Sequence, residues 1–218
     1  TDVLAAAARL ETSTAGSVLN AALSDGLVER RDGRIVGWTL TSSGRKIGQA
    51  MLSEELDAAG TRGAVTDAYL DFQSLNAEML SICTDWQVVV VNGRHVPNEH
   101  TDPVRDAAVL ARLDVLHPAA LEITGTLAAA QERFDAYGPR LSEAHAHVRA
   151  GRTEWLTRAT GASYHGTWFE LHEHLLVVLG IDRVAETVPA YTPTIVSGEA
   201  PEPSGHAPNG GHRTGDAT

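Results

Sequence analysis

The chain has 218 residues, enough for one large or two small globular domains, and 43% of them are hydrophobic. Aromatic residues make up only 5% and alanine is abundant, which favours helices over a β-sandwich. No apolar run reaches the length of a membrane span, and the single cysteine, Cys83, excludes a disulfide within the chain. We therefore expect a cytoplasmic, mainly α-helical protein with no membrane partner.

The formal net charge of −11 argues against nucleic-acid binding by the chain as a whole, because phosphate groups attract positive charge. The charge is unevenly distributed, however. Residues 1–50 hold six cationic and five acidic side chains, and four of the six cations lie between Arg30 and Arg45. A near-neutral N-terminal part with a local basic cluster is compatible with DNA binding, and the acidic remainder would stay away from DNA.

Two short helices are predicted at the start of the chain. The first covers residues 3–9, and the second follows Thr12, which we expect to be its N-terminal cap. An apolar stripe at i, i+3, i+4, i+7 and i+8 of the second helix consists of Ala15, Val18, Leu19, Ala22 and Leu23. Gly26 is expected to end this helix, because glycine readily adopts the left-handed conformation found there.

The opposite face of the second helix is polar. It carries Ser13, Ser17 and Asn20. Small side chains of this kind can approach base edges and phosphates closely. The pattern therefore predicts a helix that packs through one face and offers the other to DNA.

A β-hairpin with a positively charged tip is predicted next. Two β-prone runs, residues 27–30 and 35–40, flank Asp32-Gly33, and Asp-Gly between such runs is a strong signal for a tight turn. The arginines at or beside this tip are Arg30, Arg31 and Arg34. A hairpin of this kind after an amphipathic helix suits a wing that contacts phosphates or the minor groove. Thr41 is expected to cap the helix that follows.

Two segments of this region resemble a known family. Asp25-Gly26-Leu27-Val28-Glu29-Arg30 and Leu40-Thr41-Ser42-Ser43-Gly44-Arg45 are similar to the DGLVER and LTxxGR halves of the signature of MarR-like winged-helix transcriptional regulators. The resemblance implies that the second helix enters the major groove of double-stranded DNA and that the hairpin is the wing. The residues that it implies in DNA contact are Ser13, Thr14, Ser17, Asn20, Arg30, Arg31 and Arg34.

In that family a further helix precedes these elements and packs under the recognition helix. The sequence starts after the position of that helix. We therefore expect the stripe around Ala15, Val18 and Leu19 to be partly uncovered, and an upstream extension that restores the helix to raise stability and DNA affinity.

Residues 60–188 are predicted to form an all-α domain. A long helix runs from about Ala64 to Trp86. Its apolar face consists of Val65, Tyr69, Phe72, Met79, Leu80 and Cys83. Asn76 lies on the same face, and we expect its amide to hydrogen-bond to the backbone. Residues 87–101 break the helical period, and Val88–Val91 followed by Asn92-Gly93 fits either a strand with a tight turn or a loop.

A second helical stretch starts at Asp102 and Pro103, with aspartate as the cap and proline in the first turn. Its apolar residues are Val104, Ala108, Leu110, Leu113 and Leu116. Pro118 is expected to bend the chain into a second leg that Tyr137-Gly138-Pro139 closes. A shorter helix then covers residues 140–150.

The last long helix is predicted over residues 153–179 and holds the densest cluster of polar and aromatic side chains. The cluster contains Tyr164, His165, Trp168, Phe169, His172 and Leu176. We interpret its histidines as a buried, hydrogen-bonded pair beside Trp168. With Asn76, the residues Tyr164, His165, Trp168 and His172 are the candidate effector-binding residues, because such side chains suit a small molecule with polar groups on an apolar body. Residues 189–218 have the composition of a disordered tail.

Metal binding and catalysis are the alternatives to an effector site. The candidate ligands are Glu99, His100, His165, His172 and His174. His165 and His172 are seven residues apart, roughly 10 Å along a helix, so one ion cannot easily bind both. No nucleophile elbow, phosphate loop or dinucleotide-binding motif is present in the sequence, and Cys83 lies on a core stripe. We therefore expect neither a metal, a cofactor nor an enzymatic activity.

The sequence thus predicts a mainly α protein with a winged helix-turn-helix and its connecting helix at 1–59, and an all-α domain at 60–188. The all-α domain would dimerise, sense a ligand, or both, since operators read by such regulators are usually two-fold. The expected partners are double-stranded DNA, a second copy of the chain and a small-molecule effector. The alternative is a helical small-molecule-binding protein whose incomplete winged helix contacts another protein.

Overall fold

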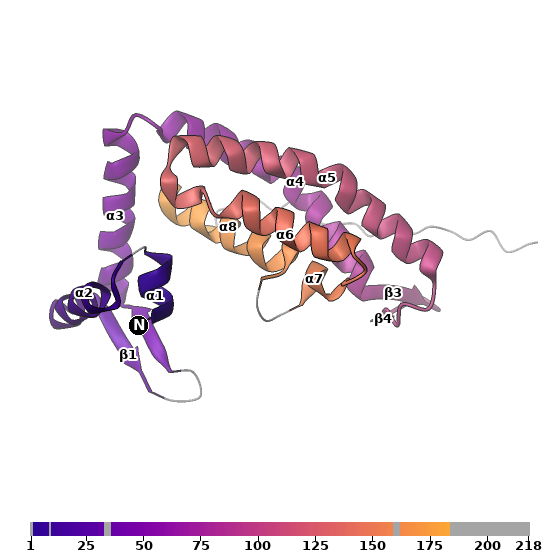
Figure 1. Ribbon diagram of the computed structural model, residues 1–218, viewed down its shortest axis with the longest axis horizontal. Helices are drawn as coiled ribbons and strands as arrows, with labels where there is room; N and C mark the ends of the chain where they lie inside the picture. The colour runs from indigo at the N-terminus through magenta and orange to yellow at the C-terminus, as the bar shows by residue number, and fades with distance from the viewer. Residues whose placement is uncertain (1, 9, 33–35, 159–161, 184–218) are drawn as a thin grey trace, which may run out of the picture.

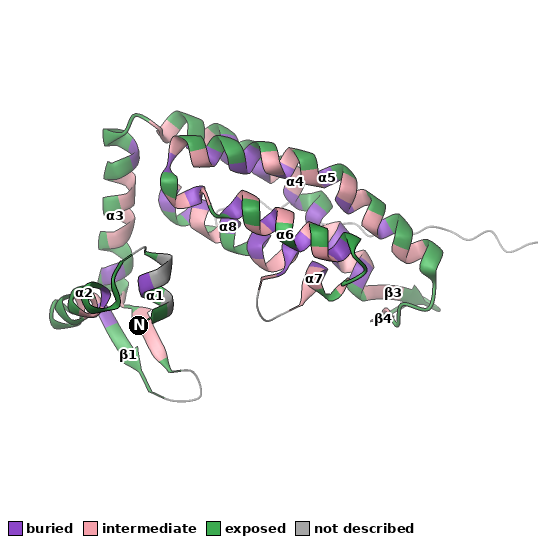
Figure 2. Ribbon diagram, viewed as in Figure 1, coloured by how far each residue is buried: buried purple, intermediate pink, exposed green. Residues whose placement is uncertain are grey.

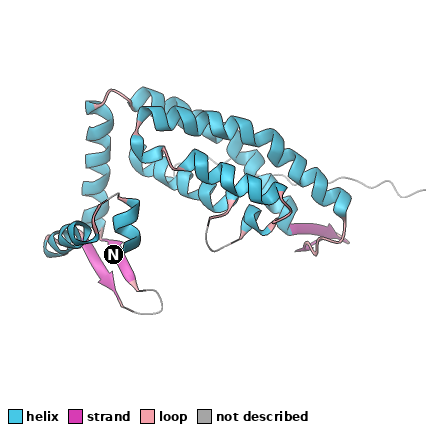
Figure 3. Cartoon of the chain, in the orientation of Figure 1, coloured by secondary structure: helices cyan, strands magenta, loops and turns pink. Residues whose placement is uncertain are grey.

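The computed structural model describes residues 2–8, 10–32, 36–158 and 162–183. This part of the chain consists mainly of α-helices with small antiparallel hairpins (Figures 1 and 3), which confirms the mainly-α fold class. The N-terminal elements are α1 (Asp2–Ala7), α2 (Thr12–Ser24), β1 (Val28–Arg31), β2 (Gly37–Leu40) and α3 (Ser42–Ala58). The later elements are α4 (Arg62–Gln87), β3 (Val88–Val91), β4 (Arg94–Pro97), α5 (Pro103–Ala130), the 3₁₀ turn η1 (Glu132–Phe134), α6 (Tyr137–Arg149), α7 (Glu154–Thr157) and α8 (Tyr164–Leu179).

Helix α2 is amphipathic, but its apolar stripe is only partly covered. Ala15 is buried, whereas Val18 is 56% exposed. The helix starts at Thr12 itself and Glu11 takes the cap position without a side-chain hydrogen bond, so the expectation that Thr12 caps α2 is wrong. Gly26, with a φ of 67°, follows the end of the helix as expected.

The first strand of the first hairpin reaches one residue further along the chain than expected, to Arg31. Strands β1 and β2 pair in antiparallel register from Val28 opposite Leu40 to Arg31 opposite Gly37. Arg31 therefore belongs to the strand, so the expectation that it lies at the hairpin tip is wrong, and the expected turn at Asp32-Gly33 extends outside the described residues. Arg34 lies outside the described residues.

The second hairpin resolves the two interpretations of residues 87–101 in favour of the strand. Val91 pairs with Arg94, so Asn92 and Gly93 form a two-residue turn. Both turn residues have left-handed backbones, with φ angles of 52° and 74°. Asparagine followed by glycine tolerates this geometry best among dipeptides, which explains why the chain turns here.

Helix α5 is one continuous helix, so the expected division into two legs at Pro118 is wrong. Pro118 removes one backbone hydrogen bond from the helix. The buried side of α5 nevertheless continues past Pro118, because Leu116 before it and Ala120 after it are both buried. Asp102 caps α5 as expected, accepting hydrogen bonds from the backbone N–H groups of Val104 and Arg105 at 3.0 and 3.1 Å.

Two other boundaries also differ from expectation. Tyr137-Gly138-Pro139 forms the first turn of α6 rather than the end of the preceding helix, a position where the missing proline N–H costs nothing. The predicted last helix is divided into α7 and α8, because Ser163 starts a new helix by accepting a hydrogen bond from the backbone N–H of Gly166 at 3.0 Å. Gly180, with a φ of 73°, ends α8 as expected.

The main core lies between α4, α5, α6 and α8 (Figure 2). Helix α3 connects this helical body to the N-terminal elements, and its last turn inserts the fully buried Leu56 into the body core. The described helices include none with the length and apolar character needed to cross a membrane. The predicted disordered tail at 189–218 lies outside the described residues.

Candidate nucleic-acid interface

The polar face of α2 is exposed along its length. Its predicted DNA-contacting residues, Ser13, Thr14, Ser17 and Asn20, are all exposed to solvent. The Ser17 hydroxyl donates a hydrogen bond to the carbonyl oxygen of Ser13 at 3.0 Å, so its proton is already hydrogen-bonded within the helix. The hydroxyl oxygen and the Asn20 amide remain accessible to a ligand, so the face can both donate and accept hydrogen bonds.

Thr41 holds the end of α2, the hairpin and the start of α3 together. Its hydroxyl donates to the carbonyl oxygens of Gly26 and Leu27, at 2.7 and 3.2 Å, and accepts from the backbone N–H of Gly44 at 3.0 Å. The Thr41 backbone N–H also donates to the carbonyl of Leu27 at 3.0 Å. One threonine therefore caps α3, as expected, and fixes the position of α3 against the strand entrance.

Gly44 and Arg45 complete this junction. A Cβ atom placed on Gly44 would lie 1.9 Å from the carbonyl oxygen of Leu27, so only glycine allows α3 to approach that close. The Arg45 guanidinium donates to the carbonyl of Leu40 at 2.8 Å and so closes the end of β2. The glycine and arginine of the LTxxGR segment thus have structural roles that sequence reasoning did not assign to them, and Thr41 makes contacts beyond the expected cap.

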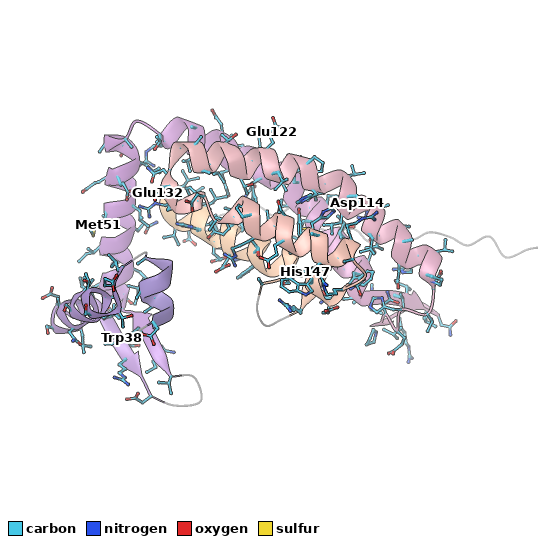
Figure 4. All side chains as sticks on the ribbon, viewed as in Figure 1. Trp38, Met51, Asp114, Glu122, Glu132 and His147 are labelled. Atoms are coloured by element: carbon cyan, nitrogen blue, oxygen red, sulfur yellow. The ribbon has the colours of Figure 1, made fainter. Side chains whose placement is uncertain are left out.

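The described arginines of the hairpin are exposed but have acidic neighbours. The Arg30 side chain is 62% exposed and lies 3.5 Å from the Asp32 carboxylate, and Arg31 is 70% exposed and lies 3.4 Å from Glu29. Arg30 also pairs across the strands with the half-buried Trp38, which Figure 4 labels on the hairpin. Ion pairs this exposed are weak, so both guanidinium groups can exchange their carboxylate partners for phosphates.

Three of the candidate effector residues, Asn76, Trp168 and His172, lie around Phe72 in the body core, whereas Tyr164 faces other residues. The Trp168 indole N–H donates to the Asn76 side-chain oxygen at 3.0 Å, and the Trp168 ring stacks on Phe72 at 4.4 Å. The partner of Asn76 is therefore a side chain and not the backbone that we expected. His172 is buried near the same phenylalanine, whereas His165 is only half-buried, so the expected buried pair is wrong. Binding of an effector stays a prediction.

Tyr164 faces a cluster that sequence reasoning missed. Its buried hydroxyl hydrogen-bonds to His117 Nδ1 at 3.1 Å, and the His117 ring stacks on His145 at 4.0 Å. His145 Nε2 in turn lies 2.8 Å from an Asp114 carboxylate oxygen. Burial, helped by the neighbouring His145, lowers the pKa of His117 to about 4, so His117 is neutral at pH 7.

Neither metal binding nor thiol chemistry finds support in this part of the chain. Within the described ranges, no group of three or more His, Cys, Asp or Glu side chains is arranged to hold a metal ion. Burial raises the pKa of the Cys83 thiol to about 12, so this cysteine is a neutral core residue at physiological pH.

No protein-family model matches the chain, and no curated protein or solved structure matches it either. The resemblance to MarR-like regulators therefore stays a prediction that rests on the two segments quoted above.

Proposed function

We propose that the N-terminal part of the chain is a DNA-binding winged helix-turn-helix and that the protein regulates transcription. The observation that carries this proposal is the combination of an exposed polar face on α2 with a hairpin whose first strand carries two exposed arginines, Arg30 and Arg31, one on each face of the strand. In helix-turn-helix proteins the second helix of the pair enters the major groove while the first crosses the backbone. Helices α1 and α2, which contact each other, would take these two roles.

The dimensions of these elements suit the groove. Helix α2 has 13 residues and is therefore about 20 Å long, and the major groove, about 12 Å wide, admits one α-helix. Because Thr41 and Gly44 fix the hairpin to the end of α2, the arginines keep a constant position relative to the polar face. Phosphate contacts that are positioned in this way orient the helix that contacts the bases.

The carboxylates of Glu29 and Asp32 favour a second candidate function, contact with another protein. They reduce the net charge of the segment from residue 29 to residue 32 to zero, and Val18 adds an apolar group next to the polar face. Winged helices that contact proteins need no excess of positive charge. Salt dependence separates the two functions, because only DNA binding releases counterions from phosphates.

The test measures binding of the full chain to a duplex selected from a random-sequence library, by fluorescence anisotropy over a range of salt concentrations. We expect affinity to fall steeply with salt. The double variant Arg30→Ala/Arg31→Ala should bind all duplexes more weakly, and its log–log salt slope should be smaller by about 2, one unit for each lost phosphate contact.

The matched control is Arg94→Ala/Arg152→Ala, which removes the same charge from exposed positions on β4 and after α6. Its salt slope should equal that of the wild type. The variant Ser17→Ala/Asn20→Ala should instead reduce the preference for the selected duplex over random DNA. Equal binding by wild type and the Arg30/Arg31 variant, or a loss as large in the control, would remove the assignment.

A further inference from the structure

Helix α2 carries no charged side chain along its length. Its 13 residues, Thr12–Ser24, include no arginine, lysine, aspartate or glutamate, and the carboxylates of Glu11 and Asp25 lie just outside its two ends. Arginine and lysine are the side chains that bind guanine O6 and N7, and acidic side chains accept hydrogen bonds from cytosine N4. If α2 enters the major groove as proposed, it therefore lacks the charged groups that recognise a G·C pair.

The hydrogen-bonding capacity of the exposed face is concentrated at Asn20. The hydroxyl protons of Ser17 and Ser24 are already donated within the helix, to the carbonyl oxygens of Ser13 and Asn20, both at 3.0 Å. The Asn20 carboxamide is exposed and makes no hydrogen bond to another described residue. It presents an NH₂ donor and an oxygen acceptor side by side, and this combination matches adenine, whose N7 accepts and whose N6 donates.

Methyl groups lie beside Asn20 on the same exposed surface. Thr14 and Ala21 are seven residues apart, so they share one side of α2, and both are exposed. Ala21 directly follows Asn20 and projects about 100° further around the helix. Thr14 and Ala21 are about 10 Å apart along the axis, which is roughly the length of three base pairs. The methyl groups of alanine and threonine suit contact with the 5-methyl group of thymine.

We propose that α2 recognises A·T pairs, with the Asn20 carboxamide bonded to N6 and N7 of an adenine and the methyl groups of Thr14 and Ala21 packed against thymine 5-methyl groups. This inference rests on the proposed function and deepens it by naming the bases. Because the two kinds of group project from adjacent sides of one helix, both bases of a pair, or of neighbouring pairs, are within their reach. Arg30 and Arg31 would supply the phosphate contacts that do not depend on sequence.

The substitution Asn20→Arg tests the adenine contact. The probe is the duplex that the full wild-type chain selects from a random-sequence library. Replacing the contacted A·T pair with G·C should weaken wild-type binding about 5- to 150-fold, the discrimination of one bidentate contact. Asn20→Arg should reverse this preference, because arginine is the bidentate partner of guanine. The control Gln87→Arg adds the same charge at an exposed position at the end of α4 and should keep the preference for A·T.

Deoxyuridine tests the methyl contacts, because it pairs like thymine and lacks only the 5-methyl group. Replacing the thymines of the selected duplex one at a time should weaken wild-type binding about 3- to 5-fold at one position or more, as expected for one buried methyl group. The double variant Thr14→Ser/Ala21→Gly should bind both duplexes equally. The control Leu23→Ala shortens another exposed apolar side chain, which lies about 180° around the helix from Thr14, and should still distinguish the two duplexes.

Circular dichroism melting establishes that the variants are folded, which the exposure of the three substituted residues leads us to expect. Salt-dependent binding in which Asn20→Arg keeps the wild-type base preference would overturn the adenine contact. Equal binding of thymine and deoxyuridine duplexes by wild type would overturn the methyl contacts. Both results would leave the proposed function intact, whereas a chain that binds no duplex in a salt-dependent way would overturn the proposed function and, with it, the inference.

Discussion

The sharpest test of the N-terminal architecture is the substitution Gly44→Ala. The added Cβ would lie 1.9 Å from the carbonyl oxygen of Leu27 and 2.8 Å from its carbonyl carbon. Both atoms belong to the backbone, so no side-chain rotation can relieve the clash. Helix α3 would have to move away from the strand entrance, and this movement would also stretch the hydrogen bonds that Thr41 makes to Gly26 and Leu27.

Overpacking of this kind costs about 1–3 kcal/mol, and weakening a partly buried hydrogen bond of Thr41 adds about 1 kcal/mol. The expected loss of about 2–4 kcal/mol falls on α2, the first hairpin and the first half of α3. Hydrogen exchange followed by mass spectrometry measures it locally: amides of residues 12–50 should exchange about 30- to 1,000-fold faster, since each 1.4 kcal/mol is a factor of ten in an opening equilibrium.

Gly48→Ala is the matched control, because it makes the same chemical change one turn later in the same helix, where a Cβ meets nothing within 4 Å. Alanine stabilises a helix interior by about 1 kcal/mol relative to glycine, so exchange should slow there. Unchanged exchange in Gly44→Ala would refute the close approach of α3 to Leu27. Equal acceleration in both variants would mean that the effect comes from α3 itself and not from this junction.

Two further predictions concern the helical body. Trp168→Phe removes the indole N–H that donates to the Asn76 side-chain oxygen and leaves this buried oxygen unpaired. In urea titrations the free energy of unfolding should therefore fall by about 1–3 kcal/mol. A loss below about 0.5 kcal/mol would contradict the role of this bond. Burial, followed by repulsion from Arg133, lowers the pKa of His174 to about 4. The unfolded chain therefore binds more protons than the folded one, and stability present above pH 6.5 should decline as the pH falls towards 4. His174→Gln should flatten this decline, and an unchanged urea midpoint profile between pH 7 and 4.5 would disprove the contribution of His174.

Local signals in the sequence predicted many of the element boundaries. Thr41 and Asp102 cap their helices, and Gly26 and Gly180 follow the ends of theirs, because each of these residues acts through the backbone within four positions. Such interactions need no knowledge of the rest of the fold. The end of β1 was less well predicted for the converse reason: an Asp-Gly pair favours a tight turn, but it does not determine the residue at which the preceding strand ends.

Helix α5 shows where reading the sequence by periodicity went wrong. Val104 and Leu113 were named together as apolar residues of this helix without being assigned to faces. Nine residues correspond to about 900°, or half a turn beyond two full turns, so the two side chains lie on opposite sides. Leu113 is 1% exposed, whereas Val104 is 79% exposed. Separating the apolar residues of α5 by angle would have placed Val104 and Leu113 on different faces before the structure was known.

The contacts that link distant segments could not be predicted from the sequence. The cluster of Asp114, His117, His145 and Tyr164 joins α5, α6 and α8, and the Asn76–Trp168 bond spans 92 residues. Each of these side chains is compatible with many partners, and only the packing of the helices selects one. The candidate effector residues were chosen for their chemistry alone, which explains why the structure separates Tyr164 from His172.

Helix α3 determines how the two parts of the molecule can act together. Its first turn is fixed to the hairpin by Thr41 and Gly44, and its last turn is anchored in the body by Leu56 and by an ion pair between Glu55 and Arg133. A helix of 17 residues is about 25 Å long and bends little. If two copies of the chain bound one operator, the separation of their α2 helices would therefore depend on how the two bodies associate. Since half-sites on DNA repeat at about 34 Å, we expect a change in the packing around Leu56 to alter DNA affinity without touching any residue proposed to contact DNA.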